Sequence, residues 1–139
     1  MRSSLVLVAL LGCVSTEPTA QPAGSPASDA SNAVSAANVG KRITLEGMAM
    51  NRKGGAVLVG KGFEVWMADF DAWPDGYYEG GDRGKRLVVT AELGEDHGLP
   101  IVVERPGEPI AQGIPVPEGT DVHAASHRFV LKNATWSPR

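Results

Sequence analysis

Aromatic and acidic side chains gather in residues 69–83, just after a short segment that carries a further tryptophan. Aromatic rings of this kind stack on sugars or anchor protein partners, and Trp and Tyr dominate binding hot spots. We therefore predict a binding site for a protein or a glycan, formed by Trp66, Trp73, Tyr77 and Tyr78. The alternative is that Trp73 closes the end of a barrel and the tyrosines cover the rim of its core.

The acidic residues of this stretch do not have the spacing of a calcium loop. An EF-hand needs a glycine five residues after its first aspartate, and Pro74 stands five residues after Asp69. His123 and His127 lie four residues apart, but zinc requires three or four converging ligands and no HExxH motif is present. Solvated carboxylates and a chance histidine spacing are the simpler interpretations, so we expect neither a metal nor another cofactor.

No sequence motif of a known catalytic mechanism is present. The chain contains no Gly-x-Ser-x-Gly elbow, no P-loop and no dinucleotide-binding fingerprint. We therefore expect a protein that is not an enzyme, and a small metal-dependent enzyme is the remote alternative. The composition also excludes a class of partner, because a net charge of −3 and a pI near 5.6 give no basic footprint for nucleic acid.

The only cysteine, Cys13, ends a short apolar run over residues 5–11. This run cannot cross a bilayer, which takes about 20 apolar residues. The sequence Leu10-Leu11-Gly12-Cys13 resembles the lipobox of bacterial lipoproteins. The resemblance implies a signal peptide over residues 1–12, cleavage before Cys13, and acyl chains such as palmitate on that residue. More than one acyl chain would anchor the protein stably in the membrane.

An ordinary secretory signal, cut near Ala20, is the alternative to lipidation. It fits poorly, because Pro18 stands where a small residue is expected before the cut. In enteric lipoproteins an aspartate after the lipidated cysteine favours the inner membrane, and Val14 stands there in this chain. The resemblance therefore predicts a lipid anchor in the cell envelope, in the outer membrane and facing the periplasm.

Low-complexity sequence separates this anchor from a single domain. Residues 13–39 are mainly Ser, Ala, Pro, Thr, Gln and Gly, a composition that cannot bury enough apolar surface to offset the entropy of ordering. We predict a lipidated, disordered linker there and a folded domain over residues 40–139. The mature chain has no second cysteine, so no disulfide within the chain is expected.

From residue 40 onward, apolar and polar residues alternate as in half-buried strands. In residues 41–46 the apolar side chains are Ile43 and Leu45, whereas Met48 and Met50 after Gly47 have the opposite parity. We therefore predict a bulge or sharp bend at Gly47. A hairpin follows, with strands over residues 56–59 and 63–67.

The second half of the domain continues this pattern after the aromatic loop. A strand over residues 84–93 should point four side chains inward, namely Leu87, Val89, Ala91 and Leu93. Residues 99–104 form a further short strand, and four prolines exclude a helix or central strand over 105–119. Thr120 or Asp121 could then cap one helical turn. The last strand, residues 127–136, should shift parity at Asn133 to present Ala134 and Trp136.

Three of these strands resemble those of small exported bacterial OB-fold domains. Residues 40–47 match a Gly-Lys-x-aliphatic-x-aliphatic-x-Gly pattern, a Gly-Lys-x-aliphatic strand begins at Gly84, and residues 129–136 match a closing aromatic-x-Leu-x-Asn-x-x-aromatic strand. The resemblance implies an all-β, OB-like barrel of five to six strands with one short helical turn. An open β-sandwich or another small barrel is the rival fold. The OB pattern would place its helix before the fourth strand, whereas the turn predicted here precedes the last.

These features together favour a non-catalytic binding module of the cell envelope. It would contact the membrane through its N-terminal lipid and a protein or glycan through the Trp66 face and the loop over residues 69–83. An inhibitor or immunity-type lipoprotein, directed against an envelope-acting toxin, is the main alternative. The sequence does not indicate an oligomeric state.

Overall fold

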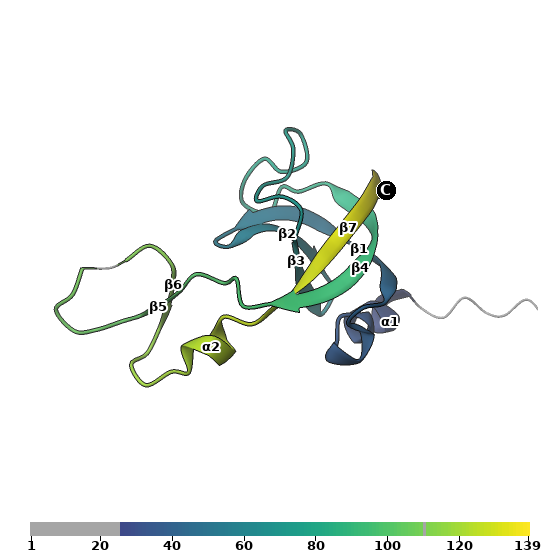
Figure 1. Cartoon of the computed structure of the whole chain (residues 1–139). Helices are drawn as coiled ribbons and strands as arrows, with labels where there is room; N and C mark the ends of the chain where they lie inside the picture. The colour runs from purple at the N-terminus through teal and green to yellow at the C-terminus, as the bar shows by residue number, and fades with distance from the viewer. Residues whose placement is uncertain (1–25, 110) are drawn as a thin grey trace, which may run out of the picture.

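The computed structural model describes residues 26–109 and 111–139. Five strands close into a barrel in the order β1-β2-β3-β7-β4 (Figure 1). Neighbouring strands are antiparallel except β3 and β7, which are parallel. The all-β barrel fold predicted from the alternation is confirmed. The barrel strands are β1 (Arg42–Arg52), β2 (Gly55–Gly60), β3 (Phe63–Met67), β4 (Arg86–Asp96) and β7 (Arg128–Pro138).

The predicted signal peptide, the lipidation site Cys13 and the first part of the linker lie outside the described residues. Within residues 26–109 and 111–139, no helix is long and apolar enough to cross a membrane.

The barrel interior is filled by the side chains whose alternation predicted the strands. On β4 the four predicted inward residues are all buried, and each faces the core. Phe63, Val65 and Met67 line the interior from β3 in the same way, as a period of two requires. The predicted hairpin is also confirmed, because β2 and β3 pair in register from Gly60↔Phe63 to Val57↔Trp66.

A bulge or sharp bend was predicted at Gly47, and the bulge is wrong, because the pairing of β1 with β4 and β2 has no shift in register. β1 runs without a break from Arg42 to Arg52, and Leu45, Gly47 and Ala49 keep one parity, with Leu45 and Ala49 in the core. The glycine instead permits close packing, since a Cβ there would lie 2.7 Å from the carbonyl oxygen of Val59. Met50 is buried on the opposite, outer face of the strand, which explains the apparent change of parity.

The parity shift predicted at Asn133 is confirmed. Asn133 has a positive φ of 50°, and the β4–β7 register slips between Thr90 and Glu92 at the same level. A bulge of this kind turns the following side chains to the other face. Ala134 and Trp136 thereby pack against the core.

One side of the barrel core is covered by the chain that precedes β1. α1 (Pro26–Ala33) and η1 (Ala36–Asn38) bring Ala30, Ala33 and Val34 against the core, and the Asn38 amide donates to the carbonyl oxygen of Ala33 at 3.1 Å. The prediction of disorder as far as residue 39 is therefore wrong for residues 30–39. A helix as short as α1 is marginal in isolation, even when it is rich in alanine. Its contact with the barrel core stabilises it.

The long connection between β4 and β7, residues 97–127, projects from the barrel (Figure 1). We call it the arm. It contains β5 (Ile101–Val103) and β6 (Ile114–Val116), which pair in parallel as a separate two-stranded sheet, and then α2 (Val122–Ala125). The predicted helical turn is confirmed, because the Asp121 carboxylate accepts from the Ala124 amide at 3.1 Å as an N-cap. The proline-rich stretch forms neither a helix nor a barrel strand, as predicted.

Candidate binding site between the arm and the barrel wall

Trp73 is part of the barrel core and not of an open surface. It is only 5% exposed, and its indole N–H donates to the carbonyl oxygen of Val57 at 2.9 Å. Its backbone N–H donates to the side chain of Asn51 at 3.0 Å, which fixes the loop that carries it. Phe70 and Trp136 both pack edge-on to the Trp73 ring, with ring centroids 5.1 and 5.4 Å away, and are tilted to each other at 5.3 Å. This is the arrangement expected if aromatic residues close the end of the barrel.

Tyr77 and Tyr78 cover the rim of the same core. The Tyr77 ring stacks on Trp73 at 6.1 Å, and the Lys85 ammonium lies 5.1 Å from the centre of the tyrosine ring. Tyr78 donates its hydroxyl to the carbonyl oxygen of Gly81 at 3.2 Å. Both tyrosines are half-buried against the core. Three of the four predicted site residues therefore lie together at one end of the barrel.

Trp66 lies elsewhere, on the outer wall of the barrel. The register joins Met50, Val57, Trp66 and Val130 in one row across four strands, on the face opposite to the core. Val57 and Val130 are nevertheless fully buried and Met50 nearly so. Trp66 itself is half-buried. Leu99 and Pro100, at the base of the arm, lie close to the Trp66 end of this row.

Gly54, in the turn between β1 and β2, shows how closely the arm approaches this wall. It has a φ of +101°, a conformation that favours glycine. A Cβ at this position would lie 3.3 Å from a Leu99 methyl, 3.3 Å from the Trp66 indole nitrogen and 3.4 Å from Pro100. The β1–β2 turn, the indole and the first residues of the arm thus meet at one point.

The indole nitrogen of Trp66 is buried without a hydrogen-bond partner, the only such side-chain atom in the part of the chain that the structure describes. A buried N–H that lacks an acceptor costs about 1–3 kcal/mol. Gly54, whose Cβ would lie 3.3 Å from this nitrogen, is one of the residues that line a hollow of about 490 Å³. The others are Lys53, Pro100, Gln112 and Gly113. The volume of this hollow is within the range of small-ligand sites. The Lys53 ammonium donates to the carbonyl oxygen of Gly113 at 2.9 Å and so links its two walls.

Arg128 ties together the two strand ends from which the arm leaves and the β1–β2 turn. Its guanidinium donates to Asp96 at 2.6 and 3.3 Å and to the carbonyl oxygen of Gly54 at 2.7 Å, and only 14% of its side chain is exposed. Desolvation opposes ionisation of Asp96. However, the hydrogen bonds from Arg128 and from the Gly98 amide, with the nearby positive charge, lower the pKa of this carboxyl below its ordinary value.

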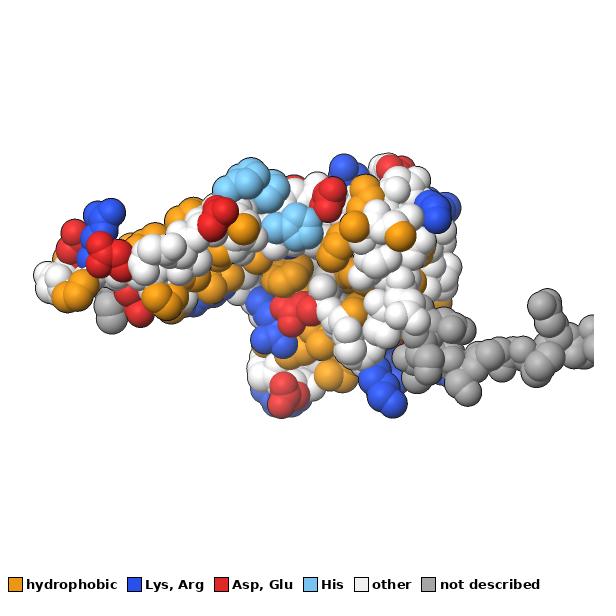
Figure 2. Space-filling view, turned by 90° about the horizontal axis from the view of Figure 1, so that it is seen from below, with side chains coloured by type: hydrophobic (Ala, Val, Ile, Leu, Met, Phe, Trp, Pro, Cys, Tyr) orange, Lys and Arg blue, Asp and Glu red, His pale blue; other side chains and the backbone are white. Residues whose placement is uncertain are grey.

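The three histidines of the chain also meet at the base of the arm (Figure 2). The rings of His97 and His123 stack with centroids 3.7 Å apart, and His127 lies edge-on to His97 at 5.6 Å. The His97 Nδ1 is 2.8 Å from the carbonyl oxygen of His123, and His127 lies 2.9 Å from the Glu95 carboxylate. Spacing along the chain did not reveal this cluster. The cluster could have been predicted only from the pairing of β4 with β7, because that pairing brings the two ends of the arm together.

The described residues contain no group of three or more His, Cys, Asp or Glu side chains arranged to hold a metal ion. The geometry of the histidines gives the reason. The rings of His97 and His123 are nearly parallel, at 16°, so their nitrogen lone pairs, which lie in the ring planes, do not converge on one point.

Comparison with protein-family models, with curated proteins and with solved structures finds no match to this chain.

Proposed function

We propose that this protein is a non-catalytic binding module of the cell envelope, anchored by lipid at Cys13. An OB-like barrel would bind a glycan at the hollow between the β1–β2 turn and the arm. A protein ligand at the same hollow is the second form of the proposal. The strand order, with its single parallel pair between β3 and β7, supports the OB-like description. Barrels of that class bind oligonucleotides and oligosaccharides on the face of strands 2 and 3 and on the loops between strands 1 and 2 and between strands 4 and 5. In this barrel those loops correspond to the β1–β2 turn and the arm.

The observation that carries the proposal is the unsatisfied indole N–H of Trp66, which lies behind Gly54, one of the residues that line this hollow. Buried polar groups are nearly always paired, so one that is not calls for an acceptor from outside the chain. Lys53 and Gln112 add further hydrogen-bond donors to the lining. A ligand rich in hydroxyl and carbonyl oxygens, as a glycan is, matches this set of donors.

The anchor rests on the sequence Leu10-Leu11-Gly12-Cys13 and on the low-complexity residues after it. Metabolic labelling with a palmitate analogue should modify the wild type and leave Cys13→Ser unlabelled. The wild type should also fractionate with the outer membrane, and the variant should be released. Labelling of both proteins, or of neither, would exclude lipidation at this residue.

Binding is tested with purified residues 26–139 and a panel of muropeptides and lipopolysaccharide core oligosaccharides. Trp66→Phe keeps an aromatic ring and removes the N–H, so we expect the affinity for any glycan that binds to fall about tenfold. Gly54→Ala should have the same effect, since its Cβ would sit beside the indole nitrogen in a strained conformation. Trp136→Phe is the matched control at the barrel end and should retain affinity.

Two results would oppose the proposal in different ways. Equal binding by Trp66→Phe, Trp136→Phe and the wild type would show that the ligand lies elsewhere. Binding of no glycan would favour the protein form instead. That form is tested by a photocrosslinking residue in place of Gln112 in intact cells, with Ser137 as the control position. A crosslinked toxin would favour the inhibitor or immunity-type alternative.

A further inference from the structure

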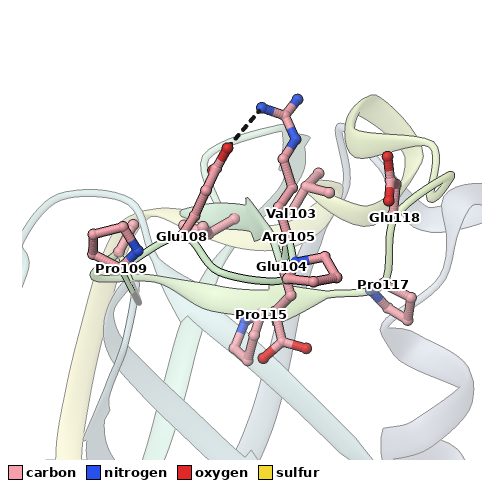
Figure 3. A pocket seen from close by; sticks show the side chains of 11 residues that line it. Val103, Glu104, Arg105, Glu108, Pro109, Pro115, Pro117 and Glu118 are labelled. Atoms are coloured by element: carbon pink, nitrogen blue, oxygen red, sulfur yellow. Dashed lines mark ion pairs between the residues drawn. The ribbon is translucent and has the colours of Figure 1, made fainter.

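The far part of the arm contains a second hollow, separate from the one beside Trp66. Its volume is about 510 Å³, and its walls combine valine and proline side chains with charged ones (Figure 3). No residue that lines this hollow also lines the first. The apolar walls can pack against hydrocarbon, and the carboxylates at its margin can pair with positive charge.

The charge of the chain is concentrated on the arm. Of sixteen acidic residues the arm holds four, Glu104, Glu108, Glu118 and Asp121, and of thirteen basic residues it holds only Arg105. The rest of the chain therefore has twelve of each and is balanced. The whole formal charge of −3 lies in the 31-residue segment that projects furthest from the barrel.

Four charged side chains line the hollow: two form an ion pair, and two carboxylates have no ion pair within the described residues. Arg105 lies 3.7 Å from Glu108 in an ion pair. Glu104 and Glu118 both line the hollow, are exposed and have no ion pair within the described residues. In Figure 3 the Glu104 side chain points down and the Glu118 side chain points up at the right of the hollow. A chain that lies in the hollow would therefore meet uncompensated negative charge.

The backbone next to the hollow also suits an extended segment. β5 and β6 form a sheet of only two strands, so each is an edge strand. Extended peptides add to a sheet at its edge strands. Pro115 leaves β6 without one amide donor, so β5 is the more suitable edge. Lysine and arginine fit the remaining chemistry, because their aliphatic stems cover apolar walls while the charged ends reach carboxylates.

We propose that the hollow of the arm docks an extended, lysine- or arginine-bearing segment of a partner protein. The acidic margin supplies electrostatic complementarity, which sets partner choice and the rate of association. This surface is distinct from the site beside Trp66, so a result that excludes one proposal does not exclude the other.

The test uses residues 26–139 and a fluorescein-labelled decapeptide of alternating Lys and Val, with alternating Glu and Val as the comparison peptide. Fluorescence anisotropy should show binding of the basic peptide only, weakening as salt is raised. The double variant Glu104→Gln/Glu118→Gln should bind it about fivefold more weakly. The control Asp75→Asn/Glu79→Gln removes the same charge from the exposed β3–β4 loop and should leave affinity unchanged.

Several outcomes would overturn the proposal. Equal weakening by both double variants would mean that only net charge matters. Equal binding of spermine at the hollow would identify a small polycation as the occupant, and binding to anionic phosphatidylglycerol vesicles would identify a lipid surface. Trp66→Phe should leave peptide binding intact, so failure at one site is distinguishable from failure at the other. Circular dichroism of each variant checks that the fold is retained.

Discussion

The barrel and the arm are held in place by different forces. Each barrel strand pairs with two neighbours, and the interior is filled by fully buried aliphatic side chains from every strand. The arm has one short parallel pair of its own. It meets the barrel through the contacts of Lys53 with Gly113 and of the Gly98 amide with Asp96, beside Leu99 and Pro100 near Trp66. Hydrophobic burial should therefore set the stability of the barrel, and a few directed contacts should set the position of the arm.

This difference suggests that the barrel and the arm have different roles. The barrel has balanced charge and closed ends, so it acts as the rigid support. The arm carries the net charge, both hollows border it, and all three histidines lie at its base. Binding surfaces are commonly loops held by a rigid scaffold. Variants in the two regions should consequently fail in different ways.

Trp73→Ala should have the largest effect on stability. The indole fills the end of the barrel and donates to Val57, so its loss leaves a cavity and an unpaired carbonyl oxygen. We expect the free energy of unfolding to fall by about 3–5 kcal/mol, measured by urea denaturation. Tyr78→Phe, which removes only an exposed hydroxyl contact, is the control and should change little. A loss below about 1 kcal/mol would contradict the role of Trp73 as a core residue.

Arg128→Ala should loosen the strand ends that carry the arm while leaving the barrel folded. Two contacts to Asp96 and one to Gly54 are lost, and we expect a cost of about 2 kcal/mol. Hydrogen exchange should increase in residues 98–120 far more than in the barrel strands. Arg86→Ala removes an exposed ion pair and should leave exchange unchanged. Uniform exchange across both regions would show that arm and barrel unfold as one unit.

Acid should weaken the same contact. The pKa of Asp96 is lowered in the folded protein, so the stability it contributes is fully present above its unfolded pKa of about 3.9 and is lost as pH falls through the folded value. Arg128→Gln removes the main cause of that shift. We expect the stability gap between wild type and variant, measured by urea denaturation, to narrow steadily from about pH 5 to pH 2. A constant gap would mean that Asp96 stays ionised or is not the partner that matters.

The barrel could be predicted from sequence because its signal is local. Alternation of period two marks each strand, and even the parity shift at Asn133 is visible in the order of apolar residues. The error at Gly47 arose because Met50 is buried on the outer face, which no local pattern reveals. Likewise Ala30 and Val34 are ordered by contact with a core that is distant in sequence.

The candidate sites were much less predictable. The aromatic residues were identified, but whether each faces the core or the wall depends on strand pairing, which separates Trp66 from Trp73, Tyr77 and Tyr78. The unsatisfied indole N–H depends on where the arm folds back. The acidic character of the arm was present in the sequence. However, its role as a docking surface could be inferred only from the structure, in which the arm projects from the barrel.

The smallest effect should come from the stacked histidines at the base of the arm. The rings of His97 and His123 lie 3.7 Å apart and nearly parallel, and the His97 Nδ1 is 2.8 Å from the carbonyl oxygen of His123. His123→Ala removes one ring of the stack and keeps that backbone contact. Hydrogen exchange of α2 and the arm should therefore rise about fivefold at most. The barrel strands serve as the internal control, because no histidine lies within their core. An equal rise in the barrel strands, or no rise in α2, would show that the stack does not govern the position of the arm.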